Sequence, residues 1–177
     1  VDVTAGSIDA EQTICSGDDP AVIGSIDDGT GPGASSWSWE SSVDGFTYNP
    51  IAGANLSTYD PPSGVTQTTY FRRIHTNTLL GVPCSATSNI HSVIVNDVAA
   101  GSISADQSLC SGEDPAVLTS VVSGTGSGSI NYSWEYSADD ILWIATGING
   151  ANYDPPPLGA TTYFRRNTIG TFWFKAC

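Results

Sequence analysis

The stretch TICSGDDPAVI at residues 13–23 returns as SLCSGEDPAVL at residues 108–118. The similarity extends outward from it, because residues 5–22 align with residues 100–117 without a gap. Two further motifs recur in the same order: SWE at residues 38–40 and 133–135, and TTYFRR at residues 68–73 and 161–166. The same motifs in the same order predict a tandem repeat with a period of about 95 residues.

Each repeat is predicted to be one domain, with boundaries at residues 1–96 and 97–177. The first repeat ends in an alternating segment, residues 89–96, that is typical of a strand. The second repeat has no equivalent, so we expect it to lack its last strand and to need cover for a sheet edge, from a following repeat or from a strand donated by another chain. Neither end resembles a natural terminus, and we interpret the chain as an interior piece of a longer secreted protein.

Charge narrows the classes of partner. The chain has 18 acidic and five basic residues, which gives a formal net charge of -13. This charge repels phosphate backbones and anionic lipid, so we expect neither nucleic acid nor a membrane surface as a partner. The sequence has no apolar stretch long enough for a membrane span, and no direct insertion is expected.

Residue types and turn signals favour strands throughout. Glycine (19) and proline (10) are frequent, and valine, isoleucine, tyrosine and tryptophan fill the apolar positions without helical periodicity. Seven strands are predicted in the first repeat, over residues 6–14, 21–27, 35–42, 46–53, 57–62, 68–77 and 89–96. Together they predict an all-β, immunoglobulin-like sandwich for each repeat. Alternation sends Trp37 and Trp39 to one face, and we expect Trp39 and its counterpart Trp134 to form the two cores.

Each repeat carries two cysteines, and this even count favours disulfides over other roles. We predict Cys15–Cys84 and Cys110–Cys177, each at one end of its domain, and each stabilising by about 4 kcal/mol in the chain-entropy model. Zinc is the alternative in the first repeat, where His75 and His91 could complete a ligand set. The second repeat has no histidine at all, so a shared structural role favours the disulfides.

No catalytic constellation recurs in the two repeats. Glu40 and Glu135 follow the core tryptophans, and their strand position predicts a solvated face rather than a glycosidase pair. A Ser-His-Asp triad could not recur, because the second repeat lacks histidine. We therefore expect no enzyme activity.

Acidic doublets occur in the cysteine-containing turns of both repeats: Asp18, Asp19, Glu113 and Asp114. Calcium takes six to eight oxygen ligands, and such turns could supply some of them. The alternative is that these carboxylates bond their own backbone within the turn. No complete calcium-loop spacing is present, so the prediction is no cofactor, with calcium as the weaker alternative.

The repeated FRR motif places two arginines next to each other in each repeat. Alternation sends Arg72 and Arg73 to opposite faces of a strand, and the same holds for Arg165 and Arg166. We expect one arginine of each pair to form a structural ion pair. The candidate carboxylates are those of the neighbouring YDPP corners: Asp60 in the first repeat and Asp154 in the second.

Three adjacent aromatics, Phe172, Trp173 and Phe174, precede the last cysteine and are predicted to lie on a hairpin tip. Aromatic side chains at a tip can hold a sugar ring or a protein surface. Packing against a neighbouring repeat is the alternative, which we favour slightly.

The combination of the AGSI, CSG-DP, SW, YDPP and TTYFRR motifs resembles the immunoglobulin-like repeats of very large surface proteins of the Bacteroidota, including gliding and adhesion proteins exported by the type IX route. The resemblance covers almost the whole chain, twice. It implies an extracellular, cell-surface location and a structural or adhesive role in a bacterial fibre, with adjacent repeats as partners and surface glycans or proteins as further ones. The alternatives are a carbohydrate- or protein-binding module that uses the aromatic loop, and a filament subunit completed by strand donation.

Overall fold

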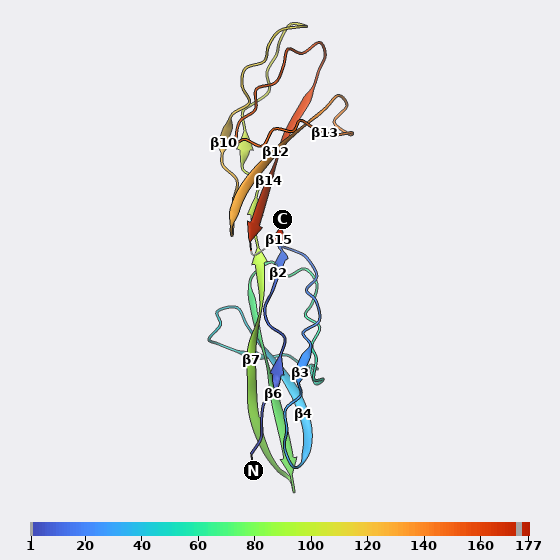
Figure 1. The fold of residues 1–177 in the computed structure, drawn as a ribbon, viewed down its shortest axis with the longest axis vertical. Coiled ribbons are helices and arrows are strands. Elements are labelled where there is room, and N and C mark those ends of the chain that lie inside the picture. The colour runs from blue at the N-terminus through green and yellow to red at the C-terminus, as the bar shows by residue number, and fades with distance from the viewer. Residues whose placement is uncertain (1, 173–174) are drawn as a thin grey trace. The chain divides into compact units, whose positions relative to one another are not determined.

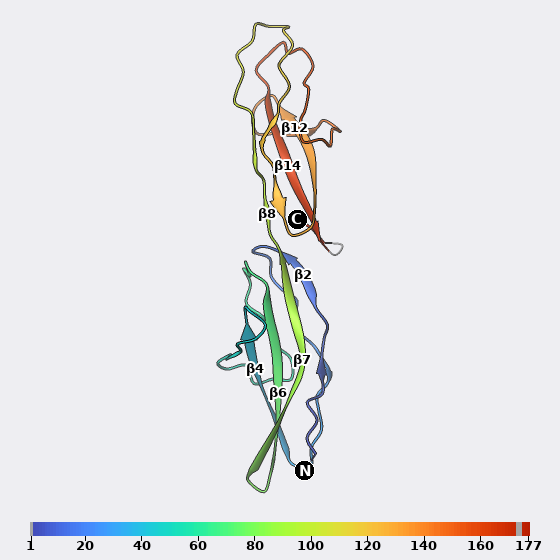
Figure 2. The same ribbon diagram turned by 90° about the vertical axis from the view of Figure 1, so that its left-hand side faces the viewer.

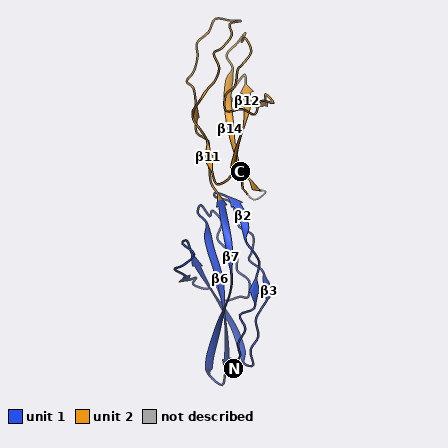
Figure 3. Cartoon of the chain, turned by 60° about the vertical axis from the view of Figure 1, so that its left-hand side comes forward, with its two compact units in different colours: residues 1–95 blue, residues 96–177 orange. Residues whose placement is uncertain are grey.

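The computed structural model describes residues 2–172 and 175–177, and within them the chain is all-β (Figure 1). It separates into two compact units, Val1–Val95 and Asn96–Cys177, which Figure 3 shows in different colours. The described residues include no helix that could cross a membrane. Each unit is described separately below.

Unit 1 contains a five-stranded sheet in the order β2-β7-β6-β4-β5 and a two-stranded sheet of β1 and β3. Figure 2 shows β4, β6 and β7 side by side in this unit. The strands are β1 (Ser7–Ile8), β2 (Gln12–Cys15), β3 (Ser25–Asp27), β4 (Ala34–Ser42), β5 (Asn49–Pro50), β6 (Thr69–Leu79) and β7 (Val82–Asn96). The predicted strand over residues 6–14 is thus divided into β1 and β2.

The two longest strands of unit 1, β6 and β7, form one hairpin whose register runs from Leu79↔Val82 at the tip to Thr69↔Val93. Leu80 and Gly81 make the turn with φ of 52° and 81°. Positive φ at both central residues defines a type I′ turn, whose twist matches that of the flanking strands. β7 therefore begins seven residues before the strand predicted over residues 89–96.

The core of unit 1 is formed by side chains from strands of both sheets. Trp39 is fully buried and its Nε1 donates to the backbone oxygen of Leu56 at 2.9 Å. Its ring lies 5.5 Å from that of Tyr59, which in turn lies 5.6 Å from Phe71. The other buried apolar side chains in this cluster are Ile8, Ile14, Ile23, Val93 and Val95.

Unit 2 has a four-stranded sheet in the order β13-β12-β14-β15 and two small sheets, β9 with β10 and β8 with β11. Trp134 is fully buried, and its Nε1 donates to the oxygen of Gly150 at 2.8 Å. The strands are β8 (Val98–Ala99), β9 (Ser102–Ile103), β10 (Ser120–Val122), β11 (Thr125–Gly126), β12 (Ser129–Ser137), β13 (Ile144–Ala145), β14 (Tyr163–Phe172) and β15 (Lys175–Ala176). Among the described residues, no strand of unit 2 takes the place that the second half of β7 has in unit 1.

Candidate functional site

The second arginine of each FRR motif lies at the centre of its unit and binds several segments of the chain. Arg73 lies on β6, and none of its side chain is exposed. Its Nη1 donates to Ser57 O at 2.8 Å and to Ser25 Oγ at 2.7 Å. Its Nη2 donates to Asp27 O at 2.6 Å and to Ala5 O at 3.2 Å. One guanidinium thus joins three distant segments to the sheet through their carbonyl groups.

Arg166 repeats this arrangement in unit 2. Its Nη1 donates to Ala151 O at 3.1 Å, and its Nη2 donates to Ala100 O and Val122 O at 3.2 and 3.1 Å. These carbonyls are the counterparts of the three that Arg73 binds. Burial lowers the pKa of Arg73 from its ordinary value, while Asp28 and Asp27 oppose that change. Asp28 also lies 3.7 Å from the Arg73 guanidinium.

The first arginine of each motif faces outward and pairs across the sheet. Arg72 lies opposite Glu40 in the β4–β6 register, and their charged groups are 2.6 Å apart. Arg165 and Glu135 repeat this pair on β14 and β12, also at 2.6 Å. Hydrogen bonds from Asn167 and then from Arg165 lower the pKa of Glu135.

The predicted ion pairs with Asp60 and Asp154 are wrong. Among the described residues, the carboxylates that form ion pairs with these arginines are Glu40, Asp28 and Glu135. Strand register explains the difference, because it sets Glu40 directly opposite Arg72, whereas the YDPP corner only follows in sequence. Glu40 and Glu135 are therefore cross-strand partners rather than purely solvated side chains.

An aromatic ring that the sequence analysis did not single out covers each outward arginine. The guanidinium carbon of Arg72 lies 3.9 Å from the Tyr48 ring centre, and that of Arg165 lies 4.1 Å from the Trp143 ring centre. The repeat alignment pairs Tyr48 with Trp143, which is the sequence signal that could have identified them.

The predicted disulfides Cys15–Cys84 and Cys110–Cys177 are also wrong. Cys84 and Cys110 are free thiols, half-buried and exposed respectively. Cys15 and Cys177 are each disulfide-bonded. The bonded cysteines therefore do not pair with the other cysteine of their own repeat.

The geometry of each unit explains why its own two cysteines stay apart. In unit 1, Asp9 and Gln12 contact His91, so β2 runs alongside the second half of β7. Cys84 lies seven residues before His91 on the same extended strand, a separation of about 23 Å. A disulfide needs Cα atoms within about 7 Å. Cys15 lies further from Cys84 still, since β2 continues in the same direction.

Unit 2 separates its cysteines in the same way. The turn that contains Cys110 is bonded to Leu158, because Gly112 N donates to Leu158 O at 2.7 Å. Cys177 instead pairs with Gly170, with backbone bonds of 2.9 and 3.1 Å. Most of β14 lies between these two places.

The acidic doublets stabilise turns. Asp18 accepts a hydrogen bond from the backbone N–H of Cys15 at 3.2 Å, and Glu113 accepts one from Cys110 at 2.9 Å. Across the described part of the chain, no group of three or more histidine, cysteine or acidic residues could hold a metal ion. These contacts favour the backbone-capping interpretation of Asp18 and Glu113; calcium binding at Asp18, Asp19, Glu113 and Asp114 stays an untested alternative.

The predicted aromatic tip is only partly visible. Phe172 ends β14, whereas Trp173 and Phe174 lie outside the described residues. The glycan or partner contact assigned to this tip stays a prediction.

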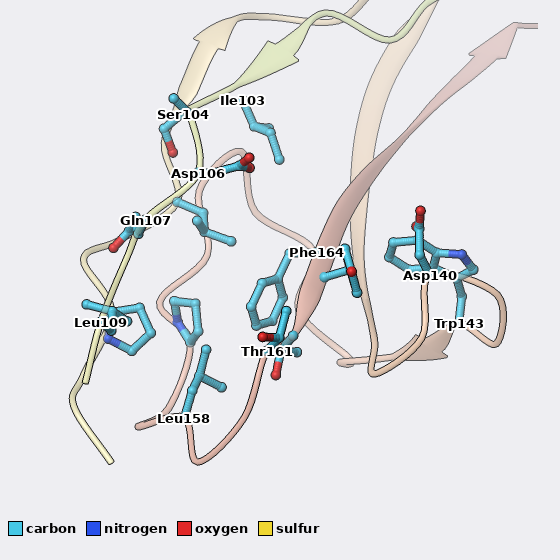
Figure 4. A pocket seen from close by; sticks show the side chains of 16 residues that line it. Ile103, Ser104, Asp106, Gln107, Leu109, Asp140, Trp143, Leu158, Thr161 and Phe164 are labelled. Atoms are coloured by element: carbon cyan, nitrogen blue, oxygen red, sulfur yellow. The ribbon is translucent and has the colours of Figure 1, made fainter. Parts of the chain in front are cut away.

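Unit 2 has an open groove, of about 400 Å³, beside the first residues of β14. Figure 4 shows Ile103, Gln107 and Leu109 on one side of it, with Phe164 and Thr161 across from them. Leu118, Leu158 and Trp143 also contribute to the apolar part of the lining. Leu109 is 40% exposed in this position.

The same place in unit 1 is filled. The repeat alignment pairs Ile103, Leu109 and Phe164 with Ile8, Ile14 and Phe71, which are at most 6% exposed. Val93 and Val95 of β7 cover those side chains in unit 1. The groove therefore occupies the position of β7, and comparison of the repeats could have located it from the sequence.

These features define a class of protein: a tandem repeat of all-β units, each centred on one buried arginine and one buried tryptophan. The chain belongs to the family described as a domain of unknown function (DUF8696), whose model matches residues 4–97 and residues 99–171. No curated protein and no solved structure matches it.

Proposed function

We propose that the chain is a structural segment of an extracellular fibre or adhesin, built from immunoglobulin-like sandwich repeats, that extends a bacterial surface protein away from the cell. The observation that carries the proposal is that the side chains shared by both repeats make contacts within their own unit. The buried arginine, the cross-strand Arg–Glu pair and the contacting Trp, Tyr and Phe rings all stabilise the fold of their own unit.

Two further observations support this role. Each repeat matches the same family model, as expected for a spacer made of similar modules. Cys15 and Cys177 are disulfide-bonded, which is typical of proteins that function in an oxidising compartment. Adjacent repeats of the same fibre are the natural partners, and surface glycans or proteins are further ones.

Surface labelling tests the proposal. Antibodies raised against the purified chain should bind intact, unpermeabilised cells of the source organism, and an external protease should remove that signal. An antibody against a cytoplasmic protein serves as the control for cell integrity. Labelling that requires lysis would contradict the proposed location and, with it, the fibre role.

A further inference from the structure

We propose that the groove of unit 2 binds an extended β-strand whose side chains follow the pattern of β7 in unit 1. This inference does not depend on the surface-fibre proposal, because it rests only on the internal geometry of the two units. The occupant is a polypeptide segment with valine or a similar β-branched residue at two alternate positions, preceded by histidine and asparagine at the same spacing as in β7.

The backbone of β14 offers an unused edge beside the groove. β12 pairs with one edge of β14 along the whole strand, from Ser137↔Tyr163 to Ser129↔Thr171. On the other edge, β15 pairs with Thr171 and Phe172, and Cys177 pairs with Gly170. Among the described residues, no strand pairs with that edge between Tyr163 and Ile169. Unpaired backbone groups at a sheet edge are a template for an added strand.

The matching edge of β6 in unit 1 shows how such a strand lies. β7 pairs with it in the register Thr69↔Val93, Tyr70↔Ser92 and Phe71↔His91. Transferred to unit 2, this register sets the two valine positions beside the apolar lining, chiefly the exposed Leu109 and the half-buried Phe164. In unit 1, Val93 and Val95 are 0% and 6% exposed, so these are the side chains that the groove would bury.

The polar groups that contact β7 in unit 1 have counterparts in the lining of the groove. In unit 1, Thr68 Oγ1 accepts from the backbone N–H of Val95 at 3.1 Å, and its counterpart Thr161 lines the groove. Gln12 contacts His91 with Nε2 at 3.1 Å while its amide also bonds Ala21. Gln107 makes the same two bonds to Ala116, both at 2.8 Å, and lines the groove as well.

These contacts favour a strand over a sugar or an unspecific apolar ligand. An occupant must satisfy a row of backbone groups on β14, fill two apolar positions about 7 Å apart, and meet one amide and one hydroxyl. An alternating polypeptide does all of this at once.

A synthetic peptide provides the test. The probe is TSNIHSVIVND, which is residues 87–97, carrying a fluorophore, titrated into the full chain and followed by anisotropy. We expect saturable binding, one peptide per chain. Replacing Val93 and Val95 of the peptide by serine should weaken the binding affinity by about tenfold or more. Replacing Ile90 and Ile94, which lie on the other face of the strand, should weaken it less.

Two matched variants of the chain locate the site. Leu109→Glu puts a charge into the groove and should reduce binding by about tenfold or more, whereas Leu142→Glu, at a residue that is 72% exposed outside it, should not. Hydrogen exchange of the amides between Tyr163 and Ile169 should slow on adding the peptide. Circular dichroism checks that both variants fold.

Four outcomes would overturn the proposal. They are no binding at millimolar peptide, equal binding of a scrambled peptide, binding unaffected by Leu109→Glu, and binding without protection of the β14 edge. Self-association of the chain that Leu109→Glu abolishes would assign the groove to a second copy instead.

Discussion

In each repeat, strand alternation sends two neighbouring arginines to different environments: one side chain faces outward and the other is buried. Arg72 and Arg73 have the same side chain and adjacent positions on β6, but one is a third exposed and the other is fully buried. A surface ion pair contributes little, since water screens it and its side chains lose entropy. A buried guanidinium that donates hydrogen bonds to carbonyl and hydroxyl oxygens is costly to remove, because those oxygens lose their donor.

The first prediction compares the two positions directly. Arg73→Met should lower the free energy of unfolding by about 3–5 kcal/mol, because it leaves the oxygens of Ala5, Asp27 and Ser57 without a donor. Arg72→Met should lower it by about 1 kcal/mol or less. Denaturant unfolding at neutral pH measures both. Equal effects of the two substitutions would contradict the central role of Arg73.

The second prediction concerns the thiols. On the native, unreduced protein, an alkylating reagent should modify Cys110 rapidly, because it is exposed, and Cys84 more slowly, because it is half-buried. Cys15 and Cys177 should react only after reduction. Peptide mass spectrometry counts the labels at each site. Label on Cys15 without a reductant, or none on Cys110, would show that the cysteines are bonded differently.

The third prediction is a pH dependence at His91. Burial lowers its pKa below 6.5, while the Asp9 carbonyl and the charges of Asp9 and Glu11 act in the opposite direction. As the pH drops through about 6.5, His91 therefore takes up a proton more readily in the unfolded chain than in the folded chain. The free energy of unfolding falls as a result. Between pH 7 and pH 5, the wild type should lose more free energy of unfolding than His91→Gln. An equal loss in both proteins would show that His91 does not contribute.

At the scale of elements, the turn of the β6–β7 hairpin is strained. Leu80 adopts φ of 52° and is 96% exposed, so its side chain gains little burial to offset the strain of a left-handed backbone. Asn–Gly is the sequence that type I′ turns prefer.

The fourth prediction follows from that turn. Leu80→Asn should raise the free energy of unfolding by about 1 kcal/mol, since asparagine accepts positive φ more readily than leucine does. Leu56→Asn is a suitable control, because this residue is 67% exposed and lies outside the strands. A destabilised Leu80→Asn variant would indicate that Leu80 makes a contact that offsets its strain.

Alternation located the central strands from the sequence but not their ends. The pattern at residues 35–42 predicts β4 (Ala34–Ser42) almost completely, and TTYFRRIHTN predicts most of β6. The Leu–Gly turn is unusual for a hairpin, so the first half of β7 was missed. The cysteine pairing could not be predicted either. Strand β2, which ends at Cys15, lies beside His91, and the length of β7 between His91 and Cys84 keeps the two cysteines apart. Strand register, which repeats alone do not specify, likewise determined the partners of Arg72 and Arg165.

At the scale of the whole molecule, the two units share the same central contacts but differ in how many apolar side chains they bury. Both units bury a tryptophan and clamp three segments with an arginine, and both use the same cysteine turn. The cluster around Trp39 in unit 1 also buries six further apolar side chains. In unit 2, Leu118 and Trp134 are the apolar side chains that reach the same degree of burial among the described residues. The aromatic and arginine centre is therefore common to both units, while the β7 strand closes the core of unit 1.

The fifth prediction is a difference in local stability between the units. Burying a valine side chain contributes about 1.5 kcal/mol or more, which is roughly tenfold in an opening equilibrium. Amide hydrogens of β12 and β14 in unit 2 should therefore exchange at least about tenfold faster than those at the matching positions of β4 and β6 in unit 1. Exchange followed by mass spectrometry on the full chain measures both units in one sample, and the aligned motifs SWE and TTYFRR supply nearly identical peptides for comparison. Equal protection of the paired peptides would mean that Val93 and Val95 add little to unit 1, and that its arginine and aromatic centre alone sets the stability of a repeat.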